Sequence, residues 1–563
     1  MEQADHLTTL DTVSKRVQFL AERCPDKELF VFYQGDERTS FTCEQVFRLA
    51  GKFAYRLRHL FNFAPRDVIA NTLPNSPERM IADLGVTLAG CTCMNGQILL
   101  ADGSDFFRSA KNSRCRGIVL KPNTDSAAWR LLHPYITGEA SSALATLSCD
   151  QTPDLTSAIC VSRTAEEARK PWLEELRDSN EEVFVDATTG PEDLLYVFTT
   201  SGSTGYSKLV PRSHGQAVGF VSSGEVSSID FSASSSKYCD RSLGWFGGYP
   251  FAAYSVGQKC VLQDWFNRHG RKTGEEIWKT ICREKCSSAA LRQVDVESVV
   301  RYIDGVGGPD FKLPLLFTGG QPVTQTQVAC ELSIAEKVFL SYGSTECCLL
   351  SMAIVEDADA EDYYCGKIMP GITLKIVDDI GDECKPKQPG TIVVQAGKMF
   401  KGYFNLLQDP DPDTVKCFTK DGWFNTEDLG YQDEDGNLYV MGRNKDTIMY
   451  GSVVLYPGWL EAEILQHPEV ADALVLPVSD PIRFHEICAC VTTVSGSGLN
   501  EEQLKAHCES IFIADLANEQ TPMPKYFMVL QSFPETPSGK TDKVKLKQLV
   551  EEKFGAGRGK HAL

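Results

Sequence analysis

The chain has 563 residues, which is more than one hydrophobic core supports, so we expect roughly three to four folding units. Hydrophobic residues make up 42% and charged residues 23%, a usual balance for a globular protein. The formal net charge of -20 argues against a nucleic-acid partner, which would need clustered positive charge. An anionic small molecule is compatible with this charge, because a loop and a few cations can form a local positive site.

Signals for targeting are weak in this sequence. Residues 1–5 carry no basic region before an apolar one, and no run of about 18 apolar residues occurs, so neither a secretory signal nor a membrane span is expected. The C-terminal His561-Ala562-Leu563 lacks the basic residue that a peroxisomal address requires. The 20 cysteines show no paired CxxC framework, which favours reduced, mostly buried thiols. We therefore expect a cytoplasmic protein, of undetermined oligomeric state.

The first half of the chain alternates helical patterns with short apolar runs. Examples of such runs are residues 30–33 and 67–70, whereas residues 145–190 are more polar and predict a surface excursion. Further runs at 313–317 and 337–340 each end at a glycine turn. This pattern predicts an α/β sheet whose loops gather at one edge, where open sheets bind ligands.

The remainder of the chain changes character twice. Residues 366–441 contain β-prone runs and frequent glycine turns, which predict a small β-rich subdomain. After residues 442–446 a compact tail follows, with an expected helix at 457–465, strands at 473–478, 487–494 and 526–530, and a helix at 501–513. Such a tail is an α+β unit able to fold separately.

The most informative segment is Thr199-Thr200-Ser201-Gly202-Ser203-Thr204-Gly205-Tyr206-Ser207-Lys208, which follows the apolar run 194–198. Glycines let the backbone approach a ligand, successive N–H groups can form an anion-binding nest, and Lys208 adds a cation. These features suit a polyphosphate, although the composition also suits a flexible Ser/Gly loop. The spacing is not that of a GxxxxGK[ST] loop, so a kinase-type or GTPase site loses its main support.

This segment resembles the signature of the adenylate-forming superfamily, which comprises acyl-CoA synthetases, aryl-CoA ligases, firefly-type luciferases and peptide-synthetase adenylation domains. Four further motifs occur in the order of that family. They are Ser341-Tyr342-Gly343-Ser344-Thr345-Glu346, Gly422-Trp423-Phe424-Asn425-Thr426-Glu427-Asp428, Gly442-Arg443-Asn444-Lys445-Asp446 and Pro537-Ser538-Gly539-Lys540. The resemblance implies an N-terminal adenylation core at 1–443, a hinge at 444–447 and a mobile C-terminal domain at 448–563.

The resemblance also assigns a role to each motif. A carboxylic acid would attack the α-phosphorus of ATP, pyrophosphate would leave, and CoA would take the acyl group as a thioester. The residues implied to bind ATP are Thr199, Thr200, Ser201, Gly202, Ser203, Thr204, Gly205, Lys208, Gly319, Gly320, Gln321, Tyr342, Gly343, Asp428 and Arg443. Thr345, Glu346 and Lys540 are the implied catalytic residues, Glu346 would also hold Mg²⁺, and Asp446 would be the hinge. Taken alone, Glu346 is a surface carboxylate after a turn and Lys540 a solvated lysine.

Several positions depart from the family pattern. Ser207 and Leu209 replace a proline and a glycine beside Lys208, and Glu427 replaces a glycine beside Asp428. Met449 and Ser452 stand where many members carry a lysine or glycine used in the thioester step, Trp459 replaces a glutamate, and Lys543 replaces an arginine. The ATP half of the chemistry is therefore expected to be more complete than the thiol half.

The acid itself is harder to infer. The segment 243–251 resembles the aromatic stretch that lines the acyl pocket of acyl-CoA synthetases, which implies Trp245, Tyr249 and Phe251 as pocket residues, with core packing as the alternative. Ala252 stands where amino-acid-specific domains carry an aspartate, which favours an acid without an ammonium group. Two other functions remain open: a luciferase-like oxidation of the acyl-adenylate, and a non-catalytic member that kept the ATP-binding fold.

Overall fold

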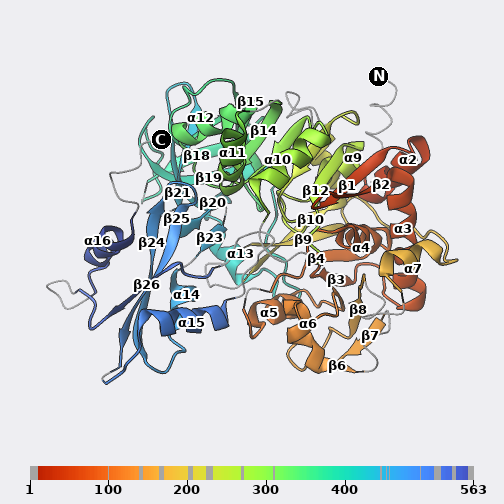
Figure 1. The fold of residues 1–563 in the computed structure, drawn as a ribbon, viewed down its shortest axis with the longest axis horizontal. Coiled ribbons are helices and arrows are strands. Elements are labelled where there is room, and N and C mark those ends of the chain that lie inside the picture. The colour runs from red at the N-terminus through yellow and green to blue at the C-terminus, as the bar shows by residue number, and fades with distance from the viewer. Residues whose placement is uncertain are drawn as a thin grey trace.

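The computed structural model of the chain describes residues 10–98, 100–137, 144–163, 170–200, 207–222, 232–267, 272–308, 311–378, 380–397, 399–443, 447–451, 453–455, 457–494, 496–512, 522–534 and 541–555. Within these residues the strands form three sheets, of 13, 8 and 5 strands. The two larger sheets belong to the N-terminal part, and the five-stranded sheet belongs to the C-terminal part, coloured blue in Figure 1.

The eight-stranded sheet carries the predicted phosphate segment. Its order is β10-β9-β4-β3-β5-β8-β7-β6, and its central strands from β9 to β8 are parallel. The residues of β3, β4 and β5 are all buried, as is typical of parallel strands covered on both faces. The bounds are β3 (Val68–Asn71), β4 (Thr92–Asn95), β5 (Gly117–Leu120), β6 (Ile136–Thr137), β7 (Leu144–Leu147), β8 (Ser157–Cys160), β9 (Leu194–Thr200) and β10 (Lys208–Ser213).

The prediction of a surface excursion over residues 145–190 is wrong in its first part. Strand β8 pairs in parallel with β5, and three of its four residues are buried. The polar residues around this short strand conceal it from a composition-based prediction, because only four residues enter the sheet. Helix α7 (Trp172–Asp178) follows, and its Trp172 ring packs edge-on against Phe53 of α3 (Cys43–Tyr55) with ring centroids 5.1 Å apart.

The thirteen-stranded sheet has a parallel half and an antiparallel half. The parallel half runs β15-β14-β13-β11-β12-β1 and is flanked by β2 (Glu37–Thr42). Its bounds are β1 (Glu28–Gln34), β11 (Ser236–Cys239), β12 (Lys259–Gln263), β13 (Ser288–Ala290), β14 (Leu313–Gly319) and β15 (Ala335–Ser344). Helices α10 (Gly274–Arg283), α11 (Gln293–Val306) and α12 (Gln325–Ile334) connect these strands. Because β11, β13 and β14 are neighbouring parallel strands, their carboxyl ends lie along one edge of the sheet.

The predicted β-rich region is present, and its strands extend the same sheet in antiparallel fashion. Its members are β16 (Cys348–Val355), β17 (Tyr364–Ile368), β18 (Ile372–Val377), β19 (Gly390–Ala396), β20 (Phe424–Gln432) and β21 (Asn437–Arg443). The remaining helices of the large domain include α2 (Val13–Arg23), α4 (Pro77–Leu88), α5 (Ser104–Asn112), α6 (Ala127–Leu132), α8 (His214–Ser222), α9 (Phe251–Val256) and α13 (Pro412–Cys417).

The C-terminal part has its own sheet and its own core. The sheet order is β23-β22-β25-β24, with β26 beside β25. The bounds are β22 (Ile448–Tyr450), β23 (Val453–Leu455), β24 (Val470–Asp480), β25 (Phe484–Thr493), β26 (Tyr526–Leu530), α14 (Pro457–Ile464), α15 (Glu501–Ile511) and α16 (Lys543–Phe554). Buried side chains such as Leu460, Val475, Ile487 and Leu504 form one cluster. A large α/β domain followed by a smaller α+β domain confirms the predicted fold class.

The two domains touch at specific backbone positions. The Gln321 side-chain amide donates to the Ile482 carbonyl at 2.9 Å, and Gln327 donates to the Pro481 carbonyl at 3.0 Å. All 20 cysteines are free. Among the helices of the described residues, none combines the length and the apolarity needed to cross a bilayer.

Candidate functional site

The predicted phosphate segment begins at the end of β9. Thr199 Oγ1 accepts a hydrogen bond of 2.8 Å from Asn95 Nδ2, and Asn95 Oδ1 accepts one of 3.3 Å from the buried Arg79. The Thr200 hydroxyl oxygen is buried and has no hydrogen-bond partner among the described residues. Lys208 pairs with Thr200 across the β9–β10 ladder. Ser201, Gly202, Ser203, Thr204 and Gly205 lie outside the described residues.

Lys208 and Glu346 are brought together by Tyr403, which the sequence did not single out. The Lys208 ammonium lies 5.0 Å from the centroid of the Tyr403 ring. The Tyr403 hydroxyl donates to Glu346 Oε1 at 3.1 Å. A cation over an aromatic face and a hydroxyl held by a carboxylate are both favourable, so this tyrosine positions the two charged groups. We call Lys208, Tyr403 and Glu346 the Lys-Tyr-Glu cluster.

The backbone that carries Thr345 and Glu346 is fixed by two further contacts. Arg212, which is 1% exposed, donates to the Thr345 carbonyl oxygen. The Phe400 amide donates to the Glu346 carbonyl oxygen at 2.9 Å. The Arg212 guanidinium also lies over the Phe246 ring, 5.4 Å from its centroid. These contacts leave the Thr345 and Glu346 side chains half-buried between β15 and β16.

Tyr342 and Asp428, predicted for adenine and ribose, are in direct contact. The Tyr342 hydroxyl donates to Asp428 Oδ2 at 2.7 Å. Burial, reinforced by the Asp428 charge, raises the pKa of Tyr342 well above its usual value, so this phenol stays a donor. Arg443 faces Asp428 in the β20–β21 ladder, which places its backbone beside the proposed ribose site.

Two glycines of the predicted site are required by close packing. A Cβ on Gly319, whose φ is +155°, would lie 2.8 Å from Ser341 Oγ. A Cβ on Gly343 would lie 2.0 Å from the Cys348 carbonyl oxygen. Any larger residue at either position would push apart the strand ends that carry Tyr342 and the Lys-Tyr-Glu cluster.

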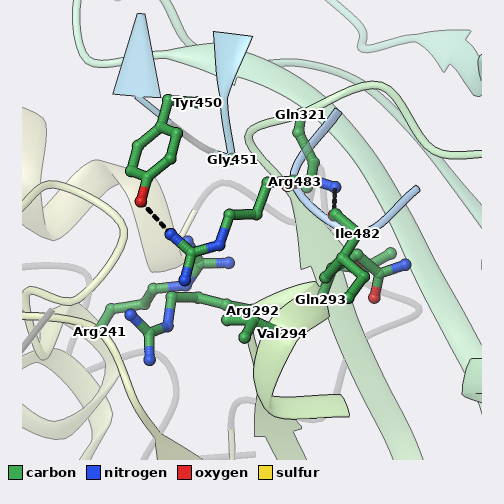
Figure 2. Close-up of a pocket in the computed structure, with 11 residues that line it drawn as sticks. Arg241, Arg292, Gln293, Val294, Gln321, Tyr450, Gly451, Ile482 and Arg483 are labelled. Carbon is green, nitrogen blue, oxygen red and sulfur yellow. Dashed lines mark hydrogen bonds between the residues drawn. The ribbon is translucent and has the colours of Figure 1, made fainter. Parts of the chain in front are cut away.

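A pocket opens between the two domains at the carboxyl ends of β11, β13 and β14 (Figure 2). Its volume is about 420 Å³, including the space at its mouth. From the large domain, Gly319 and Gln321 line it together with Arg241 and Arg292. From the C-terminal domain, the turn of the β22–β23 hairpin at Tyr450-Gly451 and the residues Ile482-Arg483 face them. The predicted adenine residues therefore share a wall with a cationic pocket.

The predicted acyl-pocket residues lie deeper than this pocket. Tyr249 and Phe251 are 6% and 7% exposed, and their ring centroids are 4.7 Å apart. Tyr249 also packs edge-on against Tyr196 of β9, with ring centroids 5.2 Å apart. Trp245 is half-buried and begins the turn that precedes Tyr249. None of the three is among the described residues that line the pocket. Their assignment to the acid stays a prediction.

Besides residues 201–205, two further predicted residues cannot be assigned a position. Lys540 and Asp446 lie outside the described residues, so their roles stay predictions. The residues that sequence reasoning missed are Asn95, Arg212, Tyr403, Arg241, Arg292 and Arg483. No local motif marks them, because each reaches the site from a different element.

Comparisons with known proteins identify the family of this chain. The family of AMP-binding enzymes matches residues 17–404, and the family of AMP-binding enzyme C-terminal domains matches residues 460–540. The medium-chain acyl-CoA ligase ACSF2 of Mus musculus is 25% identical over 96% of this chain and 88% of its own length. An uncharacterised acyl-CoA ligase, YhfT of Bacillus subtilis, is 28% identical over 65% of this chain and 70% of its own length.

Solved structures show the same fold. The o-succinylbenzoate CoA synthetase of Bacillus subtilis, as a double mutant bound to a CoA product analogue, has a TM-score of 0.74 at 20% identity, over 95% of this chain and 98% of that chain. The same enzyme in complex with AMP has a TM-score of 0.60 over 94% and 98%. The amide bond synthetase McbA of Marinactinospora thermotolerans has a TM-score of 0.74 at 21% identity, over 96% and 99%.

The names of the sequence relatives favour a ligase over the luciferase-like and the non-catalytic alternatives, and they confirm the predicted class of AMP-forming ligase. The match over 388 residues, from 17 to 404, covers more than half of the chain. The chain belongs to the AMP-binding enzyme family.

Proposed function

We propose that the protein activates a carboxylic acid with ATP and transfers the acyl group to CoA. The observation that carries this proposal is the Lys-Tyr-Glu cluster, which connects Lys208, beside the end of β9 in the eight-stranded sheet, to Glu346, four residues after Tyr342 of the thirteen-stranded sheet. In that second sheet Tyr342 contacts Asp428. These groups offer a cation and hydroxyls for phosphates, a carboxylate for a metal, and a second carboxylate for a ribose. They come from three separate sequence motifs, and Tyr403 lies outside all of them.

The reaction would proceed in two displacements. The carboxylate oxygen attacks the α-phosphorus of ATP, a new P–O bond forms, and the bond to the pyrophosphate oxygen breaks. The thiol sulfur of CoA then attacks the acyl carbon, AMP leaves with the electron pair, and the thiol proton passes to solvent. Catalysis of such steps depends mostly on positioning and on neutralising charge.

The described residues have distinct parts in this proposal. Lys208 and the Thr200 hydroxyl, which lacks a partner among the described residues, would hold the outer phosphates. Glu346 would hold Mg²⁺, since one carboxylate that is kept in place by the Tyr403 hydroxyl suits a cation that completes its shell with phosphates and water. Mg²⁺ would neutralise charge on the phosphates. Asp428 would accept from the ribose hydroxyls, and Tyr342, which donates to it, would face adenine.

The arrangement of the domains supports a role for CoA. The chain resembles the o-succinylbenzoate CoA synthetase more closely in its CoA product-analogue complex than in its AMP complex, with TM-scores of 0.74 and 0.60. The hairpin turn at Gly451 lies against Gln321, where an added Cβ would be 3.6 Å from the Gln321 side-chain oxygen. We infer that the tail beyond Asp446 is seen in the orientation for the second displacement, and that Lys540 acts in the other orientation.

Pyrophosphate release tests the proposal. A panel of fatty, aryl and dicarboxylic acids is offered with ATP and Mg²⁺, with and without CoA, and pyrophosphate and thioester are both measured. ATP-dependent release with at least one acid is the expected result, and no turnover with any acid would contradict it. Lys540→Ala should abolish adenylate formation without unfolding the protein, whereas Lys545→Ala, an exposed lysine on α16, should leave it unchanged.

A further inference from the structure

Three arginines from two domains converge on the pocket between β14 and the C-terminal domain. Arg241 follows β11, Arg292 precedes α11, and Arg483 lies in the turn between β24 and β25. Figure 2 shows their guanidinium groups gathered at one side of the pocket, with the Tyr450 ring above them. The Arg483 guanidinium donates to the Tyr450 hydroxyl and lies 4.9 Å from the centroid of its ring. Like charges that line one pocket repel one another, and an anion among them lowers the electrostatic energy.

Two buried carboxylates of the large domain, Asp240 and Asp295, lie among these cations. Asp295 accepts from Arg292 Nε at 2.7 Å and from Arg292 Nη2 at 3.1 Å. The buried Lys272 ammonium lies 3.1 Å from Asp295 and 3.3 Å from Asp240, and Arg241 Nε lies 3.4 Å from Asp240. Among the described residues of the large domain, three cations thus face two carboxylates. Arg483 adds a fourth cation, and its Nε lies 3.7 Å from Glu486 Oε1.

Burial also limits how far these two carboxyl groups neutralise the positive charge of the pocket. Burial raises the pKa of Asp240, so the negative charge of this carboxyl is disfavoured. The adjacent cations Lys272 and Arg292 lower the pKa of Asp295, which keeps that carboxylate ionised. The pocket wall also includes Gln293 and Val294, the first residues of the 14-residue helix α11. The positive end of the α11 macrodipole therefore adds to the same field.

We propose that this pocket binds a second anionic group on the acid substrate, so that the enzyme prefers dicarboxylic acids to monocarboxylic acids of the same length. The inference rests on the proposed function, because it names the substrate of that site. An arginine fork matches a carboxylate with two parallel hydrogen bonds, which a neutral chain end cannot use. A monocarboxylic acid would also have to desolvate the arginines without replacing their water.

The position of the pocket assigns the anion to the acid. The pocket lies at the carboxyl ends of β11, β13 and β14, and it shares Gly319 and Gln321 with the predicted adenine site. Arg241 and Arg292 belong to the large domain, so they are available in the first displacement, before CoA is needed. The phosphates of CoA are a second source of the same chemistry, and they would require the arginines only in the second displacement.

The decisive experiment uses the adenylation step without CoA. Pyrophosphate release by the wild-type protein is measured with succinate, glutarate, adipate and suberate, each paired with the monocarboxylic acid of the same chain length. We expect kcat/KM to be roughly 10- to 100-fold higher for at least one diacid than for its partner, the range expected when a buried charged group gains or lacks its hydrogen-bond partner. Equal values for every pair would overturn the pocket assignment while leaving the ligase activity intact.

Substitutions of the arginines test whether the preference for diacids arises in this pocket. Arg241→Gln and Arg292→Gln should each remove the preference for the diacid in the CoA-free assay, whereas Arg301→Gln, an exposed arginine of the same helix α11, should keep it. Loss of function that appears only as a raised KM for CoA would assign the arginines to the CoA phosphates and overturn the inference. Arg241→Lys, which keeps the charge in the buried network, distinguishes lost recognition from lost folding.

A binding measurement separates this inference from the proposed function. Calorimetric titration of adipate into the protein with a non-hydrolysable ATP analogue needs no turnover. Binding that is weakened by Arg241→Gln supports the anion pocket even if no acid releases pyrophosphate. If adipate does not bind but a monocarboxylic acid is turned over, the assignment of the pocket to an anion would be wrong and the proposed ligase activity would stand.

Discussion

Replacing the buried Glu331 with glutamine should stabilise the protein, and the gain should grow as the pH rises from 5 to 7. Glu331 lies in α12 and is 0% exposed. Neither of its carboxyl oxygens has a hydrogen-bond partner of good geometry among the described residues. Burial raises the pKa of Glu331 to about 8, and the neighbouring Thr318 and Gln293 only partly oppose the shift. The folded protein therefore keeps a proton on this carboxyl at neutral pH.

The size of the effect follows from the two protonation states. In the unfolded chain the carboxyl titrates near its ordinary pKa of 4.5, whereas in the folded protein it titrates near 8. Between these values the folded state holds a proton that the unfolded state has lost, so the free energy of unfolding falls as pH rises and levels off above about 8. At about 1.4 kcal/mol per pH unit, the wild type should lose about 2.5 kcal/mol from this group between pH 5 and pH 7. Glutamine has no such titration.

Thermal unfolding of the wild type and Glu331→Gln at pH 5, 6, 7 and 8, followed by circular dichroism, measures the difference directly. With about 2–4 °C of Tm per kcal/mol for a folding unit of 150–250 residues, the Tm gain of the variant should widen by about 5–10 °C from pH 5 to pH 7. Glu336→Gln, at an exposed glutamate just beyond the same helix, serves as the control and should show no such trend. A constant difference between Glu331→Gln and wild type across pH would refute the reasoning, because it would show that Glu331 ionises as in the unfolded chain.

Three further substitutions test the site. Glu427 has a φ of +62°, a left-handed conformation that costs a non-glycine residue about 1 kcal/mol, so Glu427→Gly should leave the free energy of unfolding unchanged or raise it by up to about 1 kcal/mol, and a clear loss in Tm would count against this. Asp428→Asn should raise the KM for ATP roughly 10-fold in a pyrophosphate-exchange assay, since it removes the charged acceptor for the ribose, and an unchanged KM would contradict that role. Tyr403→Phe keeps the ring under Lys208 but removes the donor to Glu346, so it should lower kcat/KM about 10-fold and raise the Mg²⁺ concentration needed, whereas wild-type kinetics would show that the hydroxyl does not position Glu346.

Much of the fold was predictable because its strands are marked by apolar runs and glycine turns. The run 194–198 forms most of β9, and the expected tail elements appear within a few residues of their predicted bounds. Strand β8 escaped prediction because four residues in a polar stretch give no periodic signal. The sequence also did not predict that the β-rich region continues the parallel sheet, because this continuity depends on the pairing of β15 with β16 and of β17 with β21 in the folded chain.

The site also contains some residues that the sequence predicted and others that it did not. Tyr342 and Asp428 belong to two motifs 86 residues apart, and the structure joins them by one hydrogen bond. Tyr403 lies outside every motif that was recognised, yet it connects Lys208 to Glu346. The left-handed backbone at Glu427 supplies a physical reason why a glycine is usual there in the family: only glycine adopts this φ without strain. Sequence reasoning finds residues that share a motif, but not those that meet only after folding.

The thiol half of the reaction looked weaker from the sequence, because Met449 and Ser452 replace residues that many members use. Met449 is 7% exposed in β22, its backbone amide donates to His485 within the C-terminal domain, and it is not among the described residues that line the pocket. Ser452 lies outside the described residues. The C-terminal domain instead presents Arg483, which reaches the pocket from the turn after β24, next to the hairpin turn at Gly451. The C-terminal domain thus supplies a cation to the pocket from the turn after β24 and not from residues 449–452. If Arg483 acts when this domain faces the pocket, its loss should slow thioester formation and leave pyrophosphate release unchanged.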